Sequence, residues 1–371
     1  MFSHSPIPDI RIDKEAKALS EKGFEIYVIC SAKGKGDIPK YYKKVFFVPL
    51  SRKQKAFIPF SYRKSKKKYQ EIIEELSPEV LHAHDLMAAN IALKVKPKMA
   101  KFIYEDHEIW ELIKKLELKE RKNILKIPIR LYQYFAAKIL TKRIMKKADL
   151  VVLVQKHWID FYQKRGINEN KMISIENFTP REIIEEAQKK KEFVDEFIKN
   201  DSRKKLVHSS KSCKPSDDYL RSIRIYAEAT KELENWVMII FGPKDEVFEE
   251  LEVKFLPPRS YIEYLACCAE CDVMINPLVL NERLNFCSPN RLYEATALGL
   301  QVISTKAQAF YENFDDLLIW IDFNTTKEDI IKILSNIDEY PSGKEIQEHT
   351  FEHHIWEKEV KKLIEKYKQL L

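Results

Sequence analysis

The sequence predicts an α/β protein with two doubly wound domains, and three observations support this fold class. Short apolar runs alternate with longer amphipathic stretches, which is typical of parallel strands joined by helices. This alternation runs twice along the chain, with a charged stretch that contains no strand between the two runs. The chain has 371 residues, 45% of them hydrophobic, which is long for one core but enough for two.

The first half of the chain is expected to form one parallel sheet covered by helices on both faces. Between its strands lie helical patterns such as residues 12–23, which end at Gly23. We place the first domain at residues 1–180. Its predicted strands are 24–30, 79–84, 101–105, 150–154 and 171–175.

The second half repeats the pattern and forms the second domain, which we place at residues 181–350. Its first part, 181–205, is predicted to be charged helix. The segment 351–371 follows as a final element, because 353–371 forms one amphipathic helix. The predicted strands of this domain are 205–209, 236–241, 253–256, 272–276, 301–304 and 317–321.

Composition excludes several classes of protein. No run of about 18 apolar residues is present, so we expect no membrane-spanning helix. The first ten residues lack the basic and apolar regions of a secretory signal. Six cysteines do not form a disulfide framework in a chain this long, which suits a reducing compartment. We therefore expect a cytoplasmic protein.

Positive charge is concentrated in the first half. The formal net charge is +7, and residues 51–69 contain eight basic residues and no acid. Residues 114–147 are also basic. The chain lacks a recognition-helix or stacking-aromatic motif, so we expect no nucleic-acid partner.

The stretch NFCSPNRLYEATALGLQVIST predicts a helix that starts at a sheet edge where ligands bind. Ser288 is the expected N-cap, Pro289 the first helical residue and Gly299 the left-handed residue that ends the helix. Free N–H groups at a helix start attract phosphate, and Arg291 in the first turn suits an anion. Glu294, one turn further, is placed to accept hydrogen bonds from vicinal hydroxyls. A well-capped surface helix is an equally good interpretation.

Polar residues also follow two predicted strands of the first half. His84 and Asp85 follow one strand, and Asp106, His107 and Glu108 follow the next. A histidine beside a carboxylate can orient substrate hydroxyls or transfer a proton. Structural histidines that cap loops are the alternative. No helical pair of histidines accompanies them, so we expect no metal site.

Two loops of the second half complete the candidate residues. Lys211 and Lys214 lie in a loop between a strand and a helix and could reach a diphosphate, or belong to a solvated basic loop. Gly242 lies in the turn FGPKDE, a candidate edge for a nucleotide base.

The order of these segments resembles the GT-B-fold glycosyltransferases of family 4 (group 1), over nearly the whole chain. The segments are IPDIRIDKEAKALSEKGFEIYVI, VLHAHDL, YEDHEIWE, VKFLPPRSYIEYLACCAECDVMINPL, SPNRLYEATALGLQVIS and HIWEKEVKKLIEKY. The resemblance implies two Rossmann-like domains facing across a cleft, with the C-terminal helix crossing back to the first domain.

The resemblance also implies an activity. It implies retaining transfer of a hexose from a nucleotide-sugar donor to a glycan or lipid-linked acceptor, with no cofactor and no protein-bound metal. The donor binds the second domain and the acceptor binds the first. The implied residues are His107 and Glu108 for catalysis; Lys211, Lys214, Gly242, Pro289, Asn290, Arg291 and Glu294 for the donor; and Asp9, Arg11, His84 and Asp85 for the acceptor.

The alternative function is a non-catalytic GT-B-like protein that binds a glycan or a partner transferase. Phe286 stands where the family has the first Glu of its E-x₇-E motif, whose second Glu matches Glu294. Ser210 and Pro257 stand where a glycine is usual.

A lipid-linked acceptor would place the protein at the inner face of a membrane. We expect peripheral membrane contact through the basic residues 52–68, since basic clusters bind anionic lipid. The helix predicted over 127–147 is expected to belong to the core.

Overall fold

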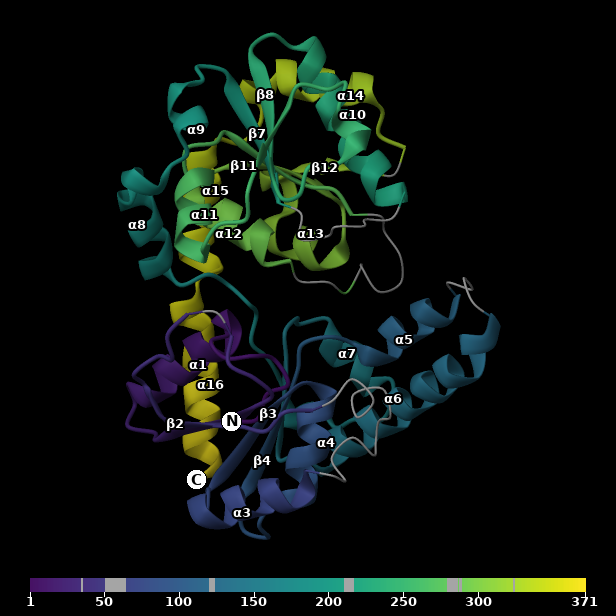
Figure 1. The fold of residues 1–371 in the computed structure, drawn as a ribbon, viewed down its shortest axis with the longest axis vertical. Helices are drawn as coiled ribbons and strands as arrows, with labels where there is room; N and C mark the ends of the chain where they lie inside the picture. The colour runs from purple at the N-terminus through teal and green to yellow at the C-terminus, as the bar shows by residue number, and fades with distance from the viewer. Residues whose placement is uncertain are drawn as a thin grey trace. The chain divides into compact units, whose positions relative to one another are not determined.

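The computed structural model describes residues 1–34, 36–50, 65–119, 124–209, 217–278, 286, 289–322 and 324–371, with the backbone alone for 217–221. These residues form two compact units. Unit 1 comprises Met1–Asn177 and Glu359–Leu371, and unit 2 comprises Phe178–Lys358. Strands and helices alternate in both units (Figure 1), which confirms the predicted α/β class.

Unit 1 contains a parallel sheet to which the first residues of the chain contribute. Phe2 pairs with Ile29 of β1 on one side and with Ala83 of β3 on the other, so the two groups of strands join. The Phe2 N–H donates to His82 O at 2.7 Å, and the His84 N–H donates to Phe2 O at 2.9 Å. The order is therefore β2-β1-Phe2-β3-β4-β5-β6. The strands are β1 (Ile26–Cys30), β2 (Tyr42–Phe47), β3 (Val80–His84), β4 (Lys101–Asp106), β5 (Leu150–Leu153) and β6 (Met172–Ser174).

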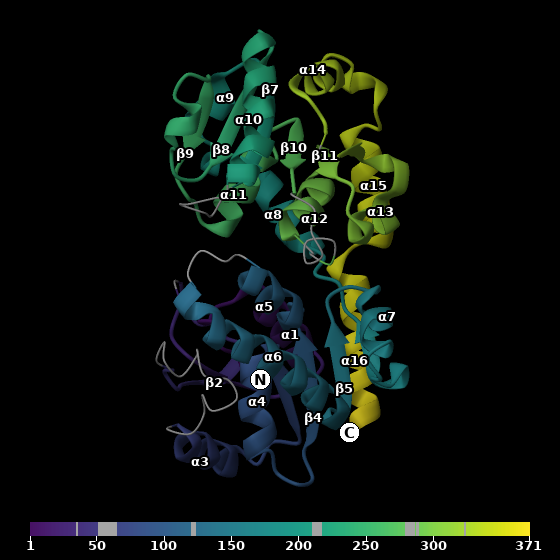
Figure 2. The same cartoon turned by 90° about the vertical axis from the view of Figure 1, so that its right-hand side faces the viewer.

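Helices connect these strands (Figure 2). Helix α1 begins after Asp9, whose carboxylate accepts hydrogen bonds from the N–H groups of Arg11 and Ile12 and so caps the helix. The others are α3 (Lys66–Leu76), α4 (Asp85–Val95), α5 (Trp110–Lys119), α6 (Ile127–Lys147) and α7 (Trp158–Gln163), after α1 (Ile10–Ser20). The last helix, α16 (Trp356–Leu370), belongs to this unit from Glu359 onward.

Unit 2 contains a six-stranded parallel sheet in the order β12-β11-β10-β7-β8-β9. Successive strands run outward from β7 on one side and from β10 on the other, so the strand order reverses between β7 and β10. Open parallel sheets bind ligands at such a reversal, beyond the carboxyl ends of the strands. The strands are β7 (Lys204–Ser209), β8 (Trp236–Phe241), β9 (Val253–Leu256), β10 (Val273–Asn276), β11 (Gln301–Thr305) and β12 (Ile319–Ile321).

Alternate side chains of these strands pack into two separate hydrophobic cores, one on each face of the sheet. Leu206 and Met238 pack in one core with α10 and α14, whereas Val207 and Ile239 pack in the other with the remaining helices. This follows from the two-residue period of a strand, and it explains why strands buried on both faces are apolar throughout. The helices are α8 (Arg181–Lys189), α9 (Glu196–Asn200), α10 (Asp217–Glu232), α11 (Tyr261–Cys268), α12 (Asn290–Leu298), α13 (Gln308–Phe314), α14 (Lys327–Ser335) and α15 (Gly343–His353).

Every strand predicted from the sequence occurs in the structure, with each end within two residues of its expected place. The prediction missed β2. Tyr42 is buried, the next two residues are exposed lysines and the rest of the strand is half-buried. The apolar run VFFV at residues 45–48 overlaps its second half, and the prediction overlooked this short run.

Helix α6 differs from its prediction as a core helix. Its second half is anchored by buried residues such as Ala137 and Ile144, but Phe135 is 53% exposed and Ile139 is 67% exposed. The helix is therefore core on one face only. Among the described residues, none of the helices has both the length and the apolar character needed to cross a membrane.

Candidate functional site

An arginine joins two strands at the reversal of the sheet in unit 2. Arg291 Nε donates to Asn276 Oδ1 at the end of β10, at 3.0 Å. Its Nη1 donates to the carbonyl oxygen of Ser209 at the end of β7, at 2.8 Å. Asn276 in turn donates through Nδ2 to Ser304 Oγ at 3.0 Å. A half-buried positive charge is thus held where parallel sheets bind anionic ligands.

The helix that carries Arg291 begins one residue later than the sequence predicted. Pro289 is the N-cap of α12, with extended backbone and no side-chain hydrogen bond, and Asn290 is the first helical residue. The expected N-cap, Ser288, lies outside the described residues. The predicted end is confirmed, because Gly299 has φ 84° and closes the helix in the left-handed conformation.

A buried carboxylate lies one turn into α12. Glu294 is buried, and its Oε1 accepts a hydrogen bond from the hydroxyl of Tyr261, the first residue of α11, at 2.9 Å. Burial and the charge of Glu294 raise the pKa of Tyr261 well above its usual range, so this hydroxyl remains a donor. The pair is a hydrogen-bonding group suited to a hydroxyl-bearing ligand, and it also links two helices.

A neutral histidine lies beneath this edge. His208 is fully buried in β7, and its Nδ1 lies 3.2 Å from the carbonyl oxygen of Ile275. Burial first, and the positive charge of Arg291 second, lower the pKa of His208 to about 3. Nδ1 therefore carries the hydrogen and donates it to Ile275.

Two of the other donor residues expected from the sequence, Lys211 and Lys214, lie outside the described residues, so their place in the site stays a prediction. Gly242 uses its N–H to pair with Leu256 O of β9 at 3.0 Å, so this group already serves the sheet.

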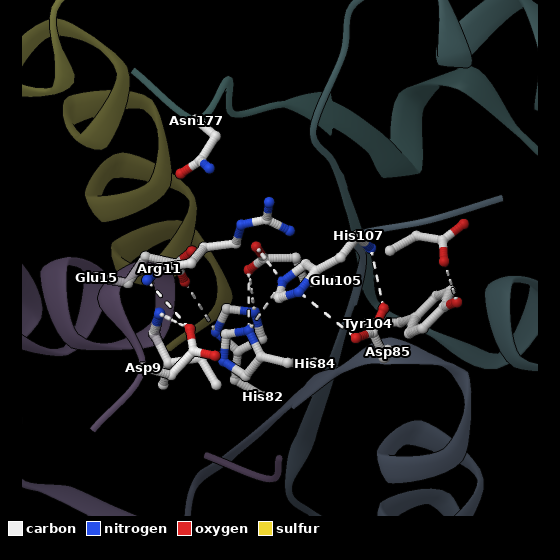
Figure 3. Close-up of polar contacts among 12 residues, drawn as sticks. Asp9, Arg11, Glu15, His82, His84, Asp85, Tyr104, Glu105, His107 and Asn177 are labelled. Carbon is white, nitrogen blue, oxygen red and sulfur yellow. Dashed lines mark hydrogen bonds and ion pairs between the residues drawn. The ribbon is translucent and has the colours of Figure 1, made fainter. Parts of the chain in front are cut away.

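The second candidate site, in unit 1, follows from the register of β3 and β4. His84 pairs with Glu105 across the two strands, so the two side chains share one face of the sheet, and His82 lies two residues earlier on that face. His107 Nε2 lies 2.9 Å from Glu105 Oε1 and 3.4 Å from His84 Nδ1 (Figure 3). The strand ends therefore bring the predicted His84 and His107 together around a carboxylate.

Asp85 holds the other side of His107. The Asp85 carboxylate accepts the N–H of His107 at 3.3 Å, and its Oδ2 lies 3.6 Å from His107 Nδ1. Asp85 has φ 68°, a left-handed conformation that costs roughly 1–3 kcal/mol in a residue other than glycine. Such strain is concentrated at functional sites, and here it aims the carboxylate at the histidine.

Charges in this group are strongly perturbed. Burial works to raise the pKa of Glu105, but the surrounding imidazoles outweigh it and hold that pKa well below its usual range. Burial lowers the pKa values of His82 and His84. The result is a buried carboxylate anion surrounded by hydrogen-bonding imidazoles.

On the opposite face of β4, a second carboxylate is buried. Tyr104 donates to Asp106 Oδ1 at 2.6 Å, and Tyr162 of α7 donates to Asp106 Oδ2. Burial raises the pKa of Asp106 to about 7, against the two hydroxyl donors. Asp106 therefore ties β4 to α7, away from the histidine face.

Of the remaining residues predicted in unit 1, Arg11 extends toward the histidines, whereas Asp9 caps a helix and Glu108 is exposed. Asp9 caps α1, and Figure 3 shows the half-buried Arg11 side chain extending toward Glu105 and His107. Glu108, expected to act beside His107, is exposed.

Residues of these sites that escaped the sequence analysis include Glu105, Tyr261 and Asn276. Glu15 of α1, whose Oε2 lies 4.0 Å from His82 Nδ1, is another. Glu15 lies on the buried face of α1, one turn from both Ile12 and Leu19, so a charge on an apolar stripe is the signal that could have found it. Asn276 is a polar residue at the end of an apolar strand, and Glu105 is a charged residue near the end of another. Tyr261 does not stand out from its neighbours in this way.

The comparisons with known proteins agree with this fold. Residues 11–182 match the model of Glycosyltransferase Family 4. The comparison with curated proteins gave no match.

Solved structures with the same fold cover nearly the whole chain. Sucrose-phosphate synthase from Thermosynechococcus elongatus shares 12% identity at a TM-score of 0.68, over 97% of this chain and 92% of that one. HepE of Anabaena, in complex with UDP and glucose, shares 13% identity at a TM-score of 0.67, over 99% of this chain and 98% of that one. UDP-GlcNAc 2-epimerase from Neisseria meningitidis, bound to UDP-GlcNAc, shares 12% identity at a TM-score of 0.60, over 97% of both chains. At these identities the likeness establishes the fold alone. The resemblance seen in the sequence is thus confirmed: the chain has the GT-B fold of glycosyltransferases, and its residues 11–182 carry the sequence pattern of Glycosyltransferase Family 4.

Proposed function

We propose that the protein is a retaining glycosyltransferase that moves a hexose from a nucleotide-sugar to a glycan or lipid-linked acceptor. The observation that carries the proposal is Arg291, held by Ser209 and Asn276 at the strand reversal of unit 2, one helical turn from the buried Glu294. A guanidinium beside a helix start can bind a diphosphate, and a buried carboxylate can bind ribose hydroxyls.

Each unit is proposed to supply one substrate site. Unit 2 binds the donor, whose leaving diphosphate is stabilised by Arg291 and the start of α12, with no cofactor and no metal at the diphosphate. Unit 1 binds the acceptor at the carboxyl ends of its strands, near His84 and Asp85. His107, held between Glu105 and Asp85, is proposed to orient a sugar hydroxyl. HepE, which has the same fold and binds UDP, supports a nucleotide-sugar as donor.

The test is binding of nucleotides, measured as thermal stability with millimolar UDP, GDP, ADP or CDP. Ligand at 100 times its dissociation constant adds about 2.7 kcal/mol, a shift that is easily measured. Glu294→Gln keeps an oxygen for the Tyr261 hydroxyl but removes the charge. We therefore expect the variant to bind the nucleotide at least tenfold more weakly, which would appear as a smaller thermal shift. Glu234→Gln, an exposed residue before the amino end of β8, is the matched control and should behave as wild type.

The outcomes separate the proposal from its rivals. If no nucleotide shifts the wild type, the non-catalytic GT-B-like protein becomes the better hypothesis, with Phe286 in place of the first motif glutamate as its explanation. If a nucleotide binds, turnover of the matching radiolabelled nucleotide-sugar follows. Label transferred to an added glycan supports a transferase, whereas a changed sugar on an intact nucleotide would indicate an epimerase.

We also propose peripheral contact with the inner face of a membrane, which a lipid-linked acceptor requires. Of the basic residues 52–68, those at 52–64 lie outside the described residues, so their part in this contact stays a prediction. Helix α6 adds support, because it exposes Phe135 and Ile139 while residues 121–148 contain basic residues and no acid. Exposed apolar side chains beside lysines and arginines suit an anionic lipid surface.

A further inference from the structure

A buried cluster of four residues lies between α1, β3 and β4 of unit 1, formed by Glu15, His82, His84 and Glu105. Each is 1% exposed. One possible metal-ligating atom from each lies within 4.8 Å of the others (Figure 3). His82 Nε2 lies 3.0 Å from Glu105 Oε2, and His84 Nδ1 lies 3.5 Å from the same oxygen. Two nitrogens and two carboxylates are thus held by one helix and two paired strands.

Two of the four residues have a buried polar atom without a hydrogen-bond partner, Glu15 Oε2 and His84 Nε2. The other two face each other, with His82 Nε2 and Glu105 Oε2 3.0 Å apart. Buried polar atoms in folded proteins are nearly always paired, so the two exceptions beside a buried carboxylate call for a further partner. Imidazole nitrogens and carboxylate oxygens can all offer a lone pair, which is the chemistry of a cation site.

The remaining atoms of two of these residues are held by neighbours. His82 Nδ1 lies 2.8 Å from the hydroxyl of Tyr367 on α16, so His82 presents Nε2 to the cluster. Glu105 Oε1 is engaged by His107 Nε2 at 2.9 Å, so Glu105 presents Oε2. Metal-binding side chains are oriented in this way by a second layer of hydrogen bonds.

We propose that Glu15, His82, His84 and Glu105 bind one Zn²⁺ ion. Imidazole nitrogens combined with carboxylates favour zinc over Mg²⁺ or Ca²⁺, which prefer oxygen ligands alone. Two carboxylates match the charge of the ion. In a tetrahedral site with bonds of 2.0–2.1 Å, neighbouring ligand atoms are roughly 3.3–3.4 Å apart, near the distances around Glu105 Oε2. Glu15 Oε2, now 4.0 Å from His82 Nδ1, would make the main adjustment.

The ion would have a structural role. Four ligands from a buried cluster leave no open position for substrate, as in closed zinc sites. It would join α1 to the two strands and, through Glu105, hold His107 in place. The inference does not depend on the proposed transferase, because every ligand lies in unit 1 and the proposed nucleotide site lies in unit 2. It differs from the expectation, from the sequence, of no metal site in this region, which remains untested.

The test is a titration of the full-length protein, stripped with a chelator and dialysed, with ZnCl₂. We expect one tight equivalent by calorimetry and elemental analysis, and a clear rise in the midpoint of thermal unfolding. Co²⁺ in place of zinc should give the intense visible bands of a four-coordinate site. Glu15→Gln and His84→Asn should each weaken binding at least tenfold, because each removes one ligand.

Two histidines on α15 could also bind zinc, so the titration needs a control variant for them. His349 and His353 are four residues apart with rings 4.7 Å apart, so they could bind zinc weakly. His353→Ala removes this pair and should keep the tight equivalent.

The proposal is overturned if the stripped wild type takes up no zinc, or if His353→Ala abolishes binding while His84→Asn preserves it. Should both cluster variants fail to fold, the Co²⁺ spectrum of the wild type and of His353→Ala still decides, since six-coordinate cobalt would contradict a closed site. A nucleotide titration of the same sample reports on unit 2 separately, so the two proposals fail independently.

Discussion

A single buried histidine gives unit 2 a predictable response to acid. His208 is fully buried and its pKa is lowered to about 3, whereas in the unfolded chain it titrates near pH 6.5. Between these values the unfolded state binds the extra proton, so stability falls as pH falls through this window, by up to roughly 1.4 kcal/mol per pH unit.

We predict that His208→Asn removes this part of the pH dependence. The asparagine amide can donate to Ile275 O as Nδ1 does, but it does not titrate. Urea unfolding of both proteins at pH 7 and pH 4.5 measures the difference. An unchanged loss of stability on acidification in the variant would show that other groups dominate.

The Tyr261 hydroxyl gives a second test at the scale of one residue. Tyr261→Phe removes a hydrogen bond to the buried Glu294, which we expect to cost about 1.5–3 kcal/mol of the free energy of unfolding because the acceptor is charged. If ribose hydroxyls bind Glu294, nucleotide should restore part of this loss, so the variant should show a larger thermal shift on saturation than the wild type. Equal shifts would place the ribose elsewhere.

At the scale of elements, two helices of unit 2 meet through glycine. The N–H groups of Gly299 and Leu300 close the end of α12, and a Cβ at Gly343 would overlap the Gly299 carbonyl oxygen. Gln347 Nε2 also donates to Ala297 O at 2.7 Å. The contact between α12, which carries Arg291, and α15 is therefore backbone against backbone.

We predict that Gly343→Ala lowers the free energy of unfolding by about 1–3 kcal/mol, because the helices must move apart to admit the methyl group. Lys344→Ala, its exposed neighbour on α15, should change stability by less than about 0.5 kcal/mol. Denaturant unfolding measures both. A tolerated Gly343→Ala would mean that the α12–α15 contact is looser than described.

Helix α6 gives the prediction for membrane binding. Vesicles with anionic lipid should sediment the protein, and zwitterionic vesicles or high salt should release it. Replacing Phe135 and Ile139 together by glutamate should weaken binding at least tenfold. Met99→Glu changes a still more exposed apolar residue, in the segment between α4 and β4 of unit 1, and should have little effect. Unaltered binding of the double variant would direct attention to residues 52–68.

The sequence contained most of the fold because its strands are buried on both faces, and such strands are apolar runs. β2, an edge strand with two exposed lysines, was missed although the short apolar run VFFV overlaps it. Only part of the candidate site could be predicted. His84 and His107 stand at strand ends and Glu294 one turn into α12, where local patterns marked them as candidates. Their partners Glu105, Tyr261 and Asn276 come from other elements, and no local pattern reveals which elements meet.

At the scale of the whole molecule, the two units should respond to different ligands. The proposed nucleotide site lies in unit 2 and the proposed zinc site lies in unit 1, and each unit has its own core. We predict two calorimetric transitions, of which nucleotide raises one and Zn²⁺ the other. A single transition that responds to both ligands would show that the units unfold together.

Unit 1 is made of two separate stretches of the chain, so its two parts are synthesised at different times. Residues 359–371 complete this unit, with Leu363 and Tyr367 buried in it, yet they leave the ribosome after all of unit 2. At about 5–20 residues per second, translation of the 181 residues 178–358 takes roughly 10–40 s. During that time the histidine face of the first sheet lacks the Tyr367 hydroxyl that binds His82. We expect the nascent first half to expose this face until the last helix is synthesised.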